Sequence, residues 1–366
     1  SKVYFANLRS RSKRDSKVMK VSRLFDKAGF GDLIKKDEIF PIKIHFGEEG
    51  SDAHIKPVFV RKVVEKIKEY NGKTFVTDTN TLYSGSRHNS VDHIETAIKH
   101  GFTYATLGAP VIIADGINSQ NIKEVEINKK HFKKVKIASD IDRSDGMIVM
   151  SHFKGHEMAG FGGAIKNLAM GCSPAAGKKD QHKVEFYVKK DKCTACKVCI
   201  NNCPVNAIEL KDGKAKIDVD TCIGCGECMS MCQFDAISMD WKAQIGTFME
   251  KMTEYAYGAV KKKSNKVGYI NFVINITPDC DCAPWSDAPI VPDIGILASK
   301  DPVALDRASY DLVNDSKGFE GSLLKSNHEK GKDKFKGMRE DTKGEIQLNY
   351  GEELGLGRNE YELIEI

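Results

Sequence analysis

Residues 193–204 read CTACKVCINNCP, and residues 222–233 read CIGCGECMSMCQ. In both stretches the four cysteines follow the spacing C-x2-C-x2-C-x3-C. The second stretch begins 29 residues after the first, and Ala207-Ile208 and Ala236-Ile237 close the two copies at the same offset. The sequence therefore contains an internal repeat whose copies each carry four identically spaced cysteines.

This cysteine spacing is the run that binds cubane iron–sulfur clusters in bacterial ferredoxins. Iron prefers soft thiolate ligands, and in two-cluster ferredoxins the fourth cysteine of each run binds the other cluster. We therefore expect a ferredoxin-like unit with two 4Fe–4S clusters and crossed ligand sets. The first set is Cys193, Cys196, Cys199 and Cys232, and the second is Cys222, Cys225, Cys228 and Cys203.

The residues between the cysteines fit this interpretation with one departure. Pro204 follows the first run as the pattern expects, whereas Gln233 stands where the second proline would stand. The small residues Ala195, Gly224 and Gly226 leave room for backbone amides to approach the sulfurs. The alternative is a zinc ribbon built from paired CxxC motifs, but the third, evenly spaced cysteine of each run does not belong to that pattern.

Length and composition narrow the class of protein. A chain of 366 residues with 41% hydrophobic residues is too long for a ferredoxin alone and suggests two to three domains. The net charge is only +5 and the densest basic run, Lys261–Lys263, is short, so we expect no nucleic-acid partner. No apolar run reaches the ~18 residues of a membrane helix and no signal peptide is evident, which predicts a cytoplasmic protein without a membrane partner. Eight cysteines in cluster spacing favour a reducing, anaerobic compartment over a secreted disulfide framework.

Apolar strands alternate with amphipathic helices on both sides of the cysteine repeat, which predicts an α/β fold with a mostly parallel sheet flanked by helices. Before the repeat, strands are expected at 3–5, 39–46, 74–77, 111–114, 134–138 and 147–150, and helices at 18–28, 57–70, 90–99 and 164–170. After it, a helix is expected at 241–257, strands at 268–276 and 291–298, and a helix at 302–313. Ser90 and Asp301 are the expected N-caps of the helices that follow them.

The order of these elements places the ferredoxin unit inside the α/β domain. Residues 1–183 would form the first part of that domain, residues 184–241 the inserted two-cluster unit, and residues 242–315 the second part. Residues 316–366 are charged and glycine-rich, and we expect a tail that packs on the surface and ends in a short strand.

Polar side chains follow several of the predicted strands. In open α/β sheets, function collects beyond the carboxyl ends of the strands. The polar residues at these ends are His45, Glu48, Asp78, Arg87, Asp115, His152 and His156. The glycine-rich stretch 158–171 that follows carries Lys166 but is not a P-loop, because the glycine spacing is wrong and Asn167 follows the lysine. We expect a pocket lined by His45, His152, His156, Lys166 and His182.

Each of these residues also has a plainer interpretation. A single histidine is more often a hydrogen-bonded structural residue than a ligand, and Lys166 could bind an anion, act as a nucleophile or pair with a carboxylate. Of these three roles for Lys166, we favour anion binding. Cys280 and Cys282 could bind a metal with Asp279 or Asp287, but buried free thiols are placed slightly ahead of a metal site. Among the other sulfur-containing residues, Cys172, Met147, Met150 and Met158 are expected in the core.

Five polar motifs outside the repeat carry a resemblance to a known family. They are KIHFGE at 43–48, DTNT at 78–81, SHFKGH at 151–156, GFGGAIKN at 160–167 and CDC at 280–282. Together they resemble the domain-of-unknown-function family 362, whose iron–sulfur members carry a two-cluster ferredoxin inside an α/β body. The resemblance covers nearly the whole chain outside the tail. It implies architecture better than function, because the family has no settled reaction.

One stretch has a second, remoter likeness. Residues 156–166 follow the pattern H-x2-A-G-F-G-G-x2-K, which is similar to the motif H-x2-A-G-[FY]-S-G-G-x-K of the lactate racemase family. In that family the histidine moves protons, the lysine anchors a nickel pincer nucleotide, and a histidine sixteen residues later binds nickel. His182 stands at this offset from Lys166, but Gly162, Ala164 and Ile165 depart from the motif. We therefore expect a related pocket rather than the pincer cofactor.

Three functions agree with these features, and all involve electron transfer through two 4Fe–4S clusters. In the first, a ferredoxin-coupled oxidoreductase, the clusters serve a reaction on a small-molecule substrate in the His/Lys-lined pocket. Lys166 would hold a carboxylate or phosphate, a histidine would transfer a proton, and Asp78 or Glu48 would orient a histidine or an additional metal. In the second, the chain is an electron-carrier subunit that docks a redox partner protein. In the third, it is a metallocentre assembly factor that uses Cys280 and Cys282.

Overall fold

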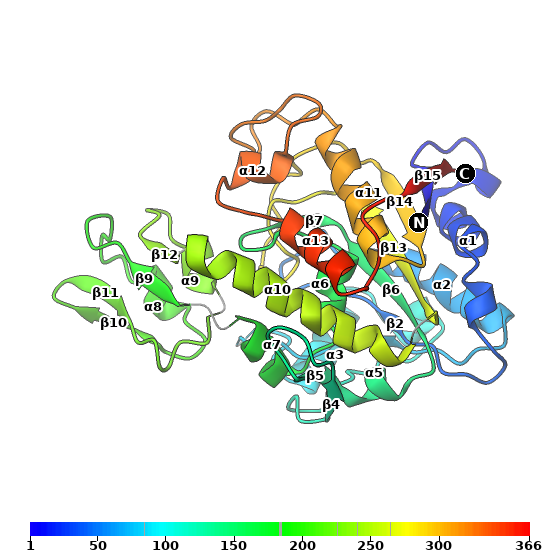
Figure 1. Ribbon diagram of the computed structural model, residues 1–366, viewed down its shortest axis with the longest axis horizontal. Coiled ribbons are helices and arrows are strands. Elements are labelled where there is room, and N and C mark those ends of the chain that lie inside the picture. The colour runs from blue at the N-terminus through cyan, green and yellow to red at the C-terminus, as the bar shows by residue number, and fades with distance from the viewer. Residues whose placement is uncertain (84, 183–184, 225, 240, 264) are drawn as a thin grey trace.

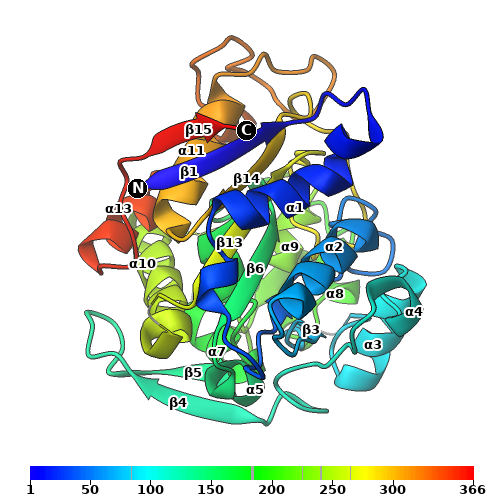
Figure 2. The same ribbon diagram turned by 90° about the vertical axis from the view of Figure 1, so that its right-hand side faces the viewer.

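The computed structural model describes residues 1–366 except 84, 183–184, 225, 240 and 264. A seven-stranded sheet with the order β15-β1-β14-β13-β6-β2-β3 forms the centre of the body (Figures 1 and 2). Its strands are β1 (Lys2–Asn7), β2 (Ile42–Lys43), β3 (Val76–Thr77), β6 (Met147–His152), β13 (Val267–Val273), β14 (Gly295–Ser299) and β15 (Glu362–Glu365). Strands β3, β2, β6 and β13 run parallel, β14 is antiparallel to β13 and β1, and β15 is parallel to β1. The predicted α/β fold with a mostly parallel sheet is confirmed.

Helices cover both faces of this sheet because the strands are apolar on both sides. Side chains alternate between the faces along a strand, so Ile148 and Met150 of β6 join one core while Met147 and Val149 join the other. Helices α1 (Lys17–Lys27) and α2 (Pro57–Glu69) cover the first face, as Figure 2 shows. Helices α6 (Ala164–Ala169), α10 (Trp241–Val260) and α11 (Pro302–Asn314) cover the second.

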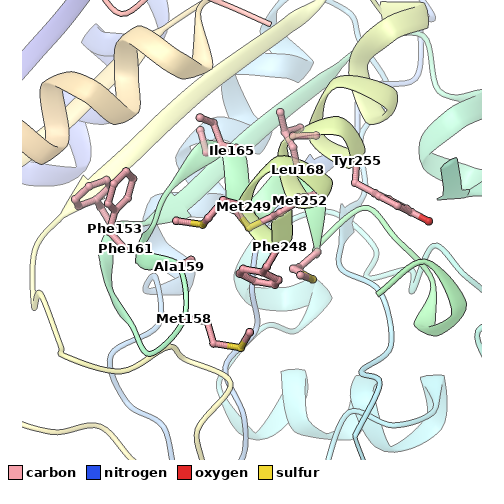
Figure 3. Close-up of a cluster of buried hydrophobic side chains, with 14 of the residues drawn as sticks. Phe153, Met158, Ala159, Phe161, Ile165, Leu168, Phe248, Met249, Met252 and Tyr255 are labelled. Carbon is pink, nitrogen blue, oxygen red and sulfur yellow. The ribbon is translucent and has the colours of Figure 1, made fainter. Parts of the chain in front are cut away.

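The core on the second face is built largely by α10 and α6 (Figure 3). Phe248, Met249 and Met252 of α10 pack toward Ile165 and Leu168 of α6, and all five side chains are buried. Helix α10 also connects the cysteine repeat to the returning strand β13 (Figure 1). The position of the glycine-rich stretch is therefore set by the same helix that carries the chain away from the repeat.

Two expected elements of the first half differ from the structure. Residues 111–114 form no strand, because only a single bridge joins Val111 to Val76. The expected strand at 134–138 exists as β5 (Lys134–Ala138), but it pairs with β4 (Ile122–Glu126) in an antiparallel hairpin outside the main sheet. The remaining short helices of this half are α3 (Ser90–Lys99), α4 (Tyr104–Leu107), α5 (Ser139–Arg143) and α7 (Ala175–His182). The apolar pattern predicted strands at 111–114 and 134–138, but it could not show which neighbouring strand each would pair with.

The structure confirms one of the two predicted helix N-caps and corrects the other. Asp301 caps α11 as predicted, since its carboxylate accepts hydrogen bonds from the backbone of Val303 at 2.9 Å and Ala304 at 3.0 Å. The cap of α3 is Asn89 rather than Ser90, because the Asn89 side chain accepts from the first turn of the helix. Both residues are favoured caps, and the register of the helix decided between them.

The two copies of the cysteine repeat have the same local structure. The first copy contains β9 (Phe186–Val188), α8 (Val198–Asn201) and β10 (Ile208–Lys211), and the second contains β11 (Lys214–Ile217), α9 (Glu227–Ser230) and β12 (Ile237–Met239). Helix α9 begins and ends 29 residues after α8, and three pairs of positive-φ residues obey the same offset: Ala195 and Gly224, Lys197 and Gly226, Asn206 and Asp235. Strand β9 pairs with β12 and β10 with β11, so the copies exchange strands. Figure 1 shows this unit beside the start of α10, at one end of the body.

The last fifty residues contribute more than a surface covering. They contain α12 (Lys334–Met338) and α13 (Glu345–Glu353), which the sequence did not predict, and the expected short strand, β15. Leu324, Phe335 and Leu348 are buried in the core on the second face of the sheet. Within the described part of the chain, no helix is both long and apolar enough to cross a membrane.

Candidate functional site

A pocket of about 940 Å³ lies at the carboxyl ends of the parallel strands. Its walls come from the segments that follow β2, β3, β6 and β13, which is where open α/β sheets place their ligands. The charged, thiol and aromatic residues of its lining are His45, Asp78, Tyr83, Arg87, His156, Glu157, Lys166, Lys178, His182, Asp279, Cys280, Cys282 and Trp285. We call it the strand-end pocket. A smaller hollow of about 430 Å³ shares His45, Lys166 and Cys280 with it.

The structure brings the predicted pocket residues together. His45, His156, Lys166 and His182 line the strand-end pocket, and His152 lines the smaller hollow. They come from segments far apart in the sequence. Their assembly follows from the parallel order of the strands that precede them.

Lys166 is positioned by a carboxylate at the start of α6. Asp306 of α11 accepts hydrogen bonds from the backbone of Ala164 at 2.7 Å and Ile165 at 2.9 Å. Glycine is needed at 163, because a Cβ there would lie 2.3 Å from Asp306 Oδ1. Held in this way, Lys166 directs its ammonium toward a thiol, with Nζ 3.4 Å from Cys280 Sγ.

Cys280 and Cys282 form an unequal pair in the wall of the strand-end pocket. The hydrogen bond from Cys282 and the nearby ammonium of Lys166 hold the pKa of Cys280 well below its ordinary value. The hydrogen bond to Cys280, together with burial, raises the pKa of Cys282 well above it. In return, the negative charge of the nearby Cys280 thiolate outweighs the opposing effect of burial and raises the pKa of Lys166. The arrangement is a thiolate and a thiol beside one ammonium, in contact with the pocket rather than enclosed in the core.

His156 and Glu157 form a second pair in the lining of the strand-end pocket. The backbone N–H groups of Met158 and Ala159 donate to His156 Nδ1 at 3.1 Å, so the ring proton resides on Nε2, which lies 3.4 Å from Glu157 Oε1. Burial, reinforced by Lys166, lowers the pKa of His156 and keeps it neutral. Burial, reinforced by Cys280, raises the pKa of Glu157 to about 7. A carboxyl group that titrates near neutrality is suited to proton transfer.

His45 and His182 are neutral as well. The Gly47 N–H donates to His45 Nδ1 at 3.0 Å, and burial lowers the pKa of this ring. Burial and Lys166 lower the pKa of His182 to about 3. Its Nδ1 is buried without a hydrogen-bond partner among the described residues. An unpaired buried nitrogen of this kind is an available acceptor for a ligand.

His152 has the plainer of its two expected roles, that of a hydrogen-bonded structural residue. Its Nδ1 lies 2.8 Å from Asp281 Oδ1, and its Nε2 lies within 3.0 Å of the carbonyls of Ile274 and Asn275. Both ring nitrogens are therefore engaged, and the ring anchors the turn that carries the two cysteines. The carboxylate that orients it is Asp281.

Glu48 and Asp78 instead neutralise buried cations under the pocket. Asp78 lies 2.9 Å from Lys43 Nζ and 3.5 Å from Arg87, and Glu48 lies 3.0 Å from Arg87. These cations and the neighbouring histidines overcome the effect of burial and lower the pKa of Asp78. The same network places Tyr83, whose hydroxyl lies 2.7 Å from Arg87 and donates to the carbonyl of Cys282 at 3.1 Å.

Lys178 is a pocket residue that sequence reasoning missed. Its Nζ donates to Thr79 Oγ1 at 2.6 Å and to the Ser173 carbonyl at 2.5 Å, and burial lowers its pKa to about 8. In the part of the chain that the structure describes, neither Lys178 nor Lys166 forms an ion pair with a carboxylate. No local pattern marked Lys178, because it lies in α7, a helix whose weakly amphipathic sequence gave no signal.

The cysteines of the repeat surround two separate hollows. One hollow, of about 380 Å³, is lined by Cys193, Cys196, Cys199 and Cys232. The other, of about 310 Å³, is lined by Cys203, Cys222 and Cys228. Cys225 lies outside the described residues. The two hollows thus divide the described cysteines into the same crossed sets that the sequence predicts.

Backbone amides approach several of these sulfurs. Ala207 N donates to Cys203 Sγ at 3.2 Å, and Ala236 N donates to Cys232 Sγ at 3.3 Å, at equivalent positions of the two copies. Gly224 N lies 3.4 Å from Cys222 Sγ. Across the described residues, no three His, Cys, Asp or Glu side chains lie close enough to hold a single metal ion.

The second hollow lies against the wall of the strand-end pocket. Gly226 and Ile223 line that hollow, and a Cβ at Gly226 would lie 3.3 Å from Met158 Sδ. Met158 follows the His156-Glu157 pair directly in the sequence. On the same side, His182 interacts with the backbone of Gly224. Met158 therefore connects this hollow to the segment that carries the His156-Glu157 pair.

Comparisons with known proteins give a family and distant structural likenesses. Residues 41–311 match the family described as Domain of unknown function (DUF362). The lactate racemase apoprotein from Thermoanaerobacterium thermosaccharolyticum is similar at 15% identity and a TM-score of 0.39, covering 74% of this chain and 50% of that one. A protein from Thermotoga maritima is similar at 9% identity and a TM-score of 0.35, covering 71% of this chain and 50% of that one. The chain thus spans about half the length of each solved structure, and no curated protein matches it.

Proposed function

Because the chain belongs to the DUF362 family, whose description assigns no reaction, we propose its function from the arrangement of its own residues. We propose an iron–sulfur protein that carries electrons through two 4Fe–4S clusters and couples them to a redox reaction in the strand-end pocket. The observation that carries the proposal is the matching of each crossed cysteine set to its own hollow. The family resemblance on the polar motifs agrees with it.

The chain's own residues fit such clusters in three ways. Apart from Thr194 and Lys197 in the first hollow, each hollow is lined by cysteines and apolar residues, so thiolates would meet little competing water. Backbone N–H groups of Ala207 and Ala236 already point at ligand sulfurs, and such hydrogen bonds tune cluster potentials. When bound, 4Fe–4S clusters supply one-electron transfer. The thiols of a cubane set bind different iron atoms, so they need not be gathered as closely as those around a single ion.

The contact between the repeat and the pocket supports coupling. Met158 follows the pocket residue Glu157 in sequence and packs against Gly226, which lines the second hollow. In the first hollow, Cys196 is exposed, which suits exchange with a redox partner protein. The contact of Met158 with the second hollow suits exchange with the pocket.

The chemistry of the pocket suits a small anionic substrate. Lys166 and Lys178 carry ammonium groups without carboxylate partners among the described residues, so a carboxylate or phosphate would find two cations in the lining. His156 presents a neutral ring with its proton on Nε2, next to the carboxyl group of Glu157. These two residues are suited to exchange the proton that accompanies electron transfer to a substrate.

Iron analysis of the full chain, reconstituted under anaerobic conditions, tests the first half of the proposal. We expect about eight iron atoms per chain, falling to about four in Cys232→Ser, whose ligand set would be broken. Cys172→Ser is the matched control, because Cys172 is buried away from both hollows and should leave the iron content unchanged. Reconstituted protein without iron would refute the proposal.

Coupling to the pocket is tested by electron paramagnetic resonance of the reduced protein. An anionic probe such as oxalate, bound in the pocket, should change the spectrum of one cluster and leave the other unchanged. Substituting Lys166 and Lys178 by Met should abolish that change while iron remains at its full content. A spectrum unaffected by any anion would instead favour the electron-carrier subunit.

A further metal would alter the assignment of the pocket. Stoichiometric nickel, zinc or additional iron that disappears in His156→Ala, Lys166→Ala or His182→Ala would indicate a metal-dependent reaction. Loss of such a metal only in Cys280→Ser would favour the assembly role. Cluster iron with no further metal would favour the electron-carrier subunit, unless an anion changes the spectrum of one cluster.

A further inference from the structure

The turn that carries Cys280 and Cys282 is fixed to the body on several sides. The Ala283 N–H closes the turn on the Cys280 carbonyl at 2.9 Å, and the Glu48 N–H donates to the Asp281 carbonyl at 2.9 Å. Arg339 donates to the Asp279 carboxylate at 2.5 Å from the C-terminal segment. The side chain of Asp281 turns away toward His152, so the two cysteines that flank it share the pocket side of the turn.

The position of the pair leads us to infer a second chemical activity, which does not depend on the clusters. We propose that Cys280 and Cys282 form a thiol–disulfide exchange site that reduces small-molecule disulfides entering the strand-end pocket. The supporting geometry is two thiols on one face of a rigid turn, a lysine ammonium 3.4 Å from one of them, and a pocket that admits a ligand.

The two sulfurs have different roles in the exchange. Cys280, whose pKa is lowered by Cys282 and by Lys166, supplies the nucleophilic thiolate. It attacks one sulfur of the substrate disulfide, forming a mixed disulfide and releasing the first substrate half as a thiolate. Cys282 then gives up its proton and attacks Cys280 Sγ, which closes the Cys280–Cys282 disulfide and releases the second half as a thiolate. The substrate gains two electrons, and the pair loses them.

A proton acceptor for the second step lies in the same pocket. Glu157 has a pKa of about 7 and senses the charge of Cys280, so it can take the proton that Cys282 releases. Because both cysteines lie in one turn, the closing step is intramolecular, which favours it over attack by a second external thiol.

Size and charge define the substrate class. Cys280 is only 4% exposed and is reached through the pocket, so a folded protein could not bring its own disulfide to this sulfur. Lys178 offers a second ammonium in the pocket lining without a carboxylate partner among the described residues. The expected substrate is therefore a small disulfide that bears an anionic group.

The test uses the full chain, purified under anaerobic conditions, with three disulfides of similar size. They are anionic 3,3′-dithiodipropionate, neutral bis(2-hydroxyethyl) disulfide and cationic cystamine. After each exposure, free thiols are capped with N-ethylmaleimide and the peptide that contains both cysteines is weighed. We expect an internal Cys280–Cys282 disulfide, two released thiols per chain, and a reaction about tenfold faster with the anionic probe than with the cationic one.

Three variants separate the steps. Cys282→Ser should stop at a mixed disulfide on Cys280, Cys280→Ser should not react at a comparable rate, and Lys166→Met should slow the first attack. Lys178→Met should remove the preference for the anionic probe, while Cys172→Ser should behave as the unmodified chain.

The unmodified chain alone can overturn the proposal, whatever the folding of the variants. Two capped thiols after exposure to all three probes would refute it, and so would a first mixed disulfide on Cys282. Peptide mapping and iron content, measured on the same samples, distinguish this result from a failure of the cluster proposal. Loss of iron would expose the repeat cysteines, whereas exchange at Cys280 and Cys282 leaves them unaltered.

Discussion

Replacing Asp306 by Asn would test how the lysine of the pocket is held in place. The Asp306 carboxylate is fully buried and accepts three hydrogen bonds, from the backbone of Ala164 and Ile165 and from Asn271 Nδ2 at 2.7 Å. Asparagine has the same shape but only one acceptor oxygen. One of the three donors would then lose its partner, which costs about 1–3 kcal/mol for a buried group.

The pH dependence gives the sharper prediction. Burial, partly opposed by the hydrogen bond from Asn271, raises the pKa of Asp306 from 3.8 to about 6. A shift of this size corresponds to about 3 kcal/mol. Because the folded carboxyl group holds its proton more tightly than the unfolded one, its contribution to stability is complete below the unfolded pKa. It is lost as the pH rises through the folded pKa, and it is constant above that value.

Urea unfolding of both proteins between these two pKa values measures the effect. The free energy of unfolding of the unmodified chain, relative to Asp306→Asn, should fall by about 3 kcal/mol across this window and then level off. Asp315→Asn, at the exposed end of the same helix, controls for the change in net charge. Parallel curves for the unmodified chain and Asp306→Asn would refute the raised pKa.

Two further substitutions test the burial of charge and the contact between the repeat and the pocket. Lys43→Met should lower the free energy of unfolding by about 3–5 kcal/mol, because it removes the ammonium that lies 2.9 Å from the buried Asp78 carboxylate. Lys73→Met, at an exposed ion pair, is the control and should cost less than about 1 kcal/mol. Urea titration measures both values. Gly226→Ala should lower the free energy of unfolding by more than the ~1–2 kcal/mol expected for a left-handed alanine, because its Cβ would also lie 3.3 Å from a methionine sulfur. Gly213→Ala measures the backbone cost alone, because Gly213 has a similar φ and no neighbour within 4 Å.

The central sheet could be predicted because each of its long strands carries its own signal. The run from Met147 is apolar on both faces, as a strand covered by helices on both sides must be, and it lies at the centre of the sheet. The segment 111–114 has the same composition but makes a single bridge, since pairing depends on a neighbour that local sequence does not specify. The hairpin that contains β5 was misplaced for the same reason.

The pocket was predictable in membership but not in detail. The strand ends predicted His45 and His156, because the carboxyl ends of parallel strands meet at one edge, and the glycine-rich stretch 158–171 predicted Lys166. The partner of His152 was not predictable, since Asp281 is 129 residues away in sequence. It also lies between two cysteines, which were themselves the candidate functional residues of that segment. Lys178 had no signal at all, because its role depends on a helix that returns beneath the strand ends.

The two ends of the cysteine repeat are joined to helices that fix its position relative to the pocket. Its chain enters directly after α7, which ends at His182, and leaves into α10, which packs on the helix that carries Lys166. An inserted unit joined only by flexible linkers would have no fixed relation to the pocket. Here Gly226 fits against Met158 so closely that even one added carbon would meet its sulfur. The hollow lined by Cys203, Cys222 and Cys228 therefore has a fixed contact with the segment that carries the His156-Glu157 pair. This contact supports the proposed coupling between the clusters and the pocket over a free electron carrier.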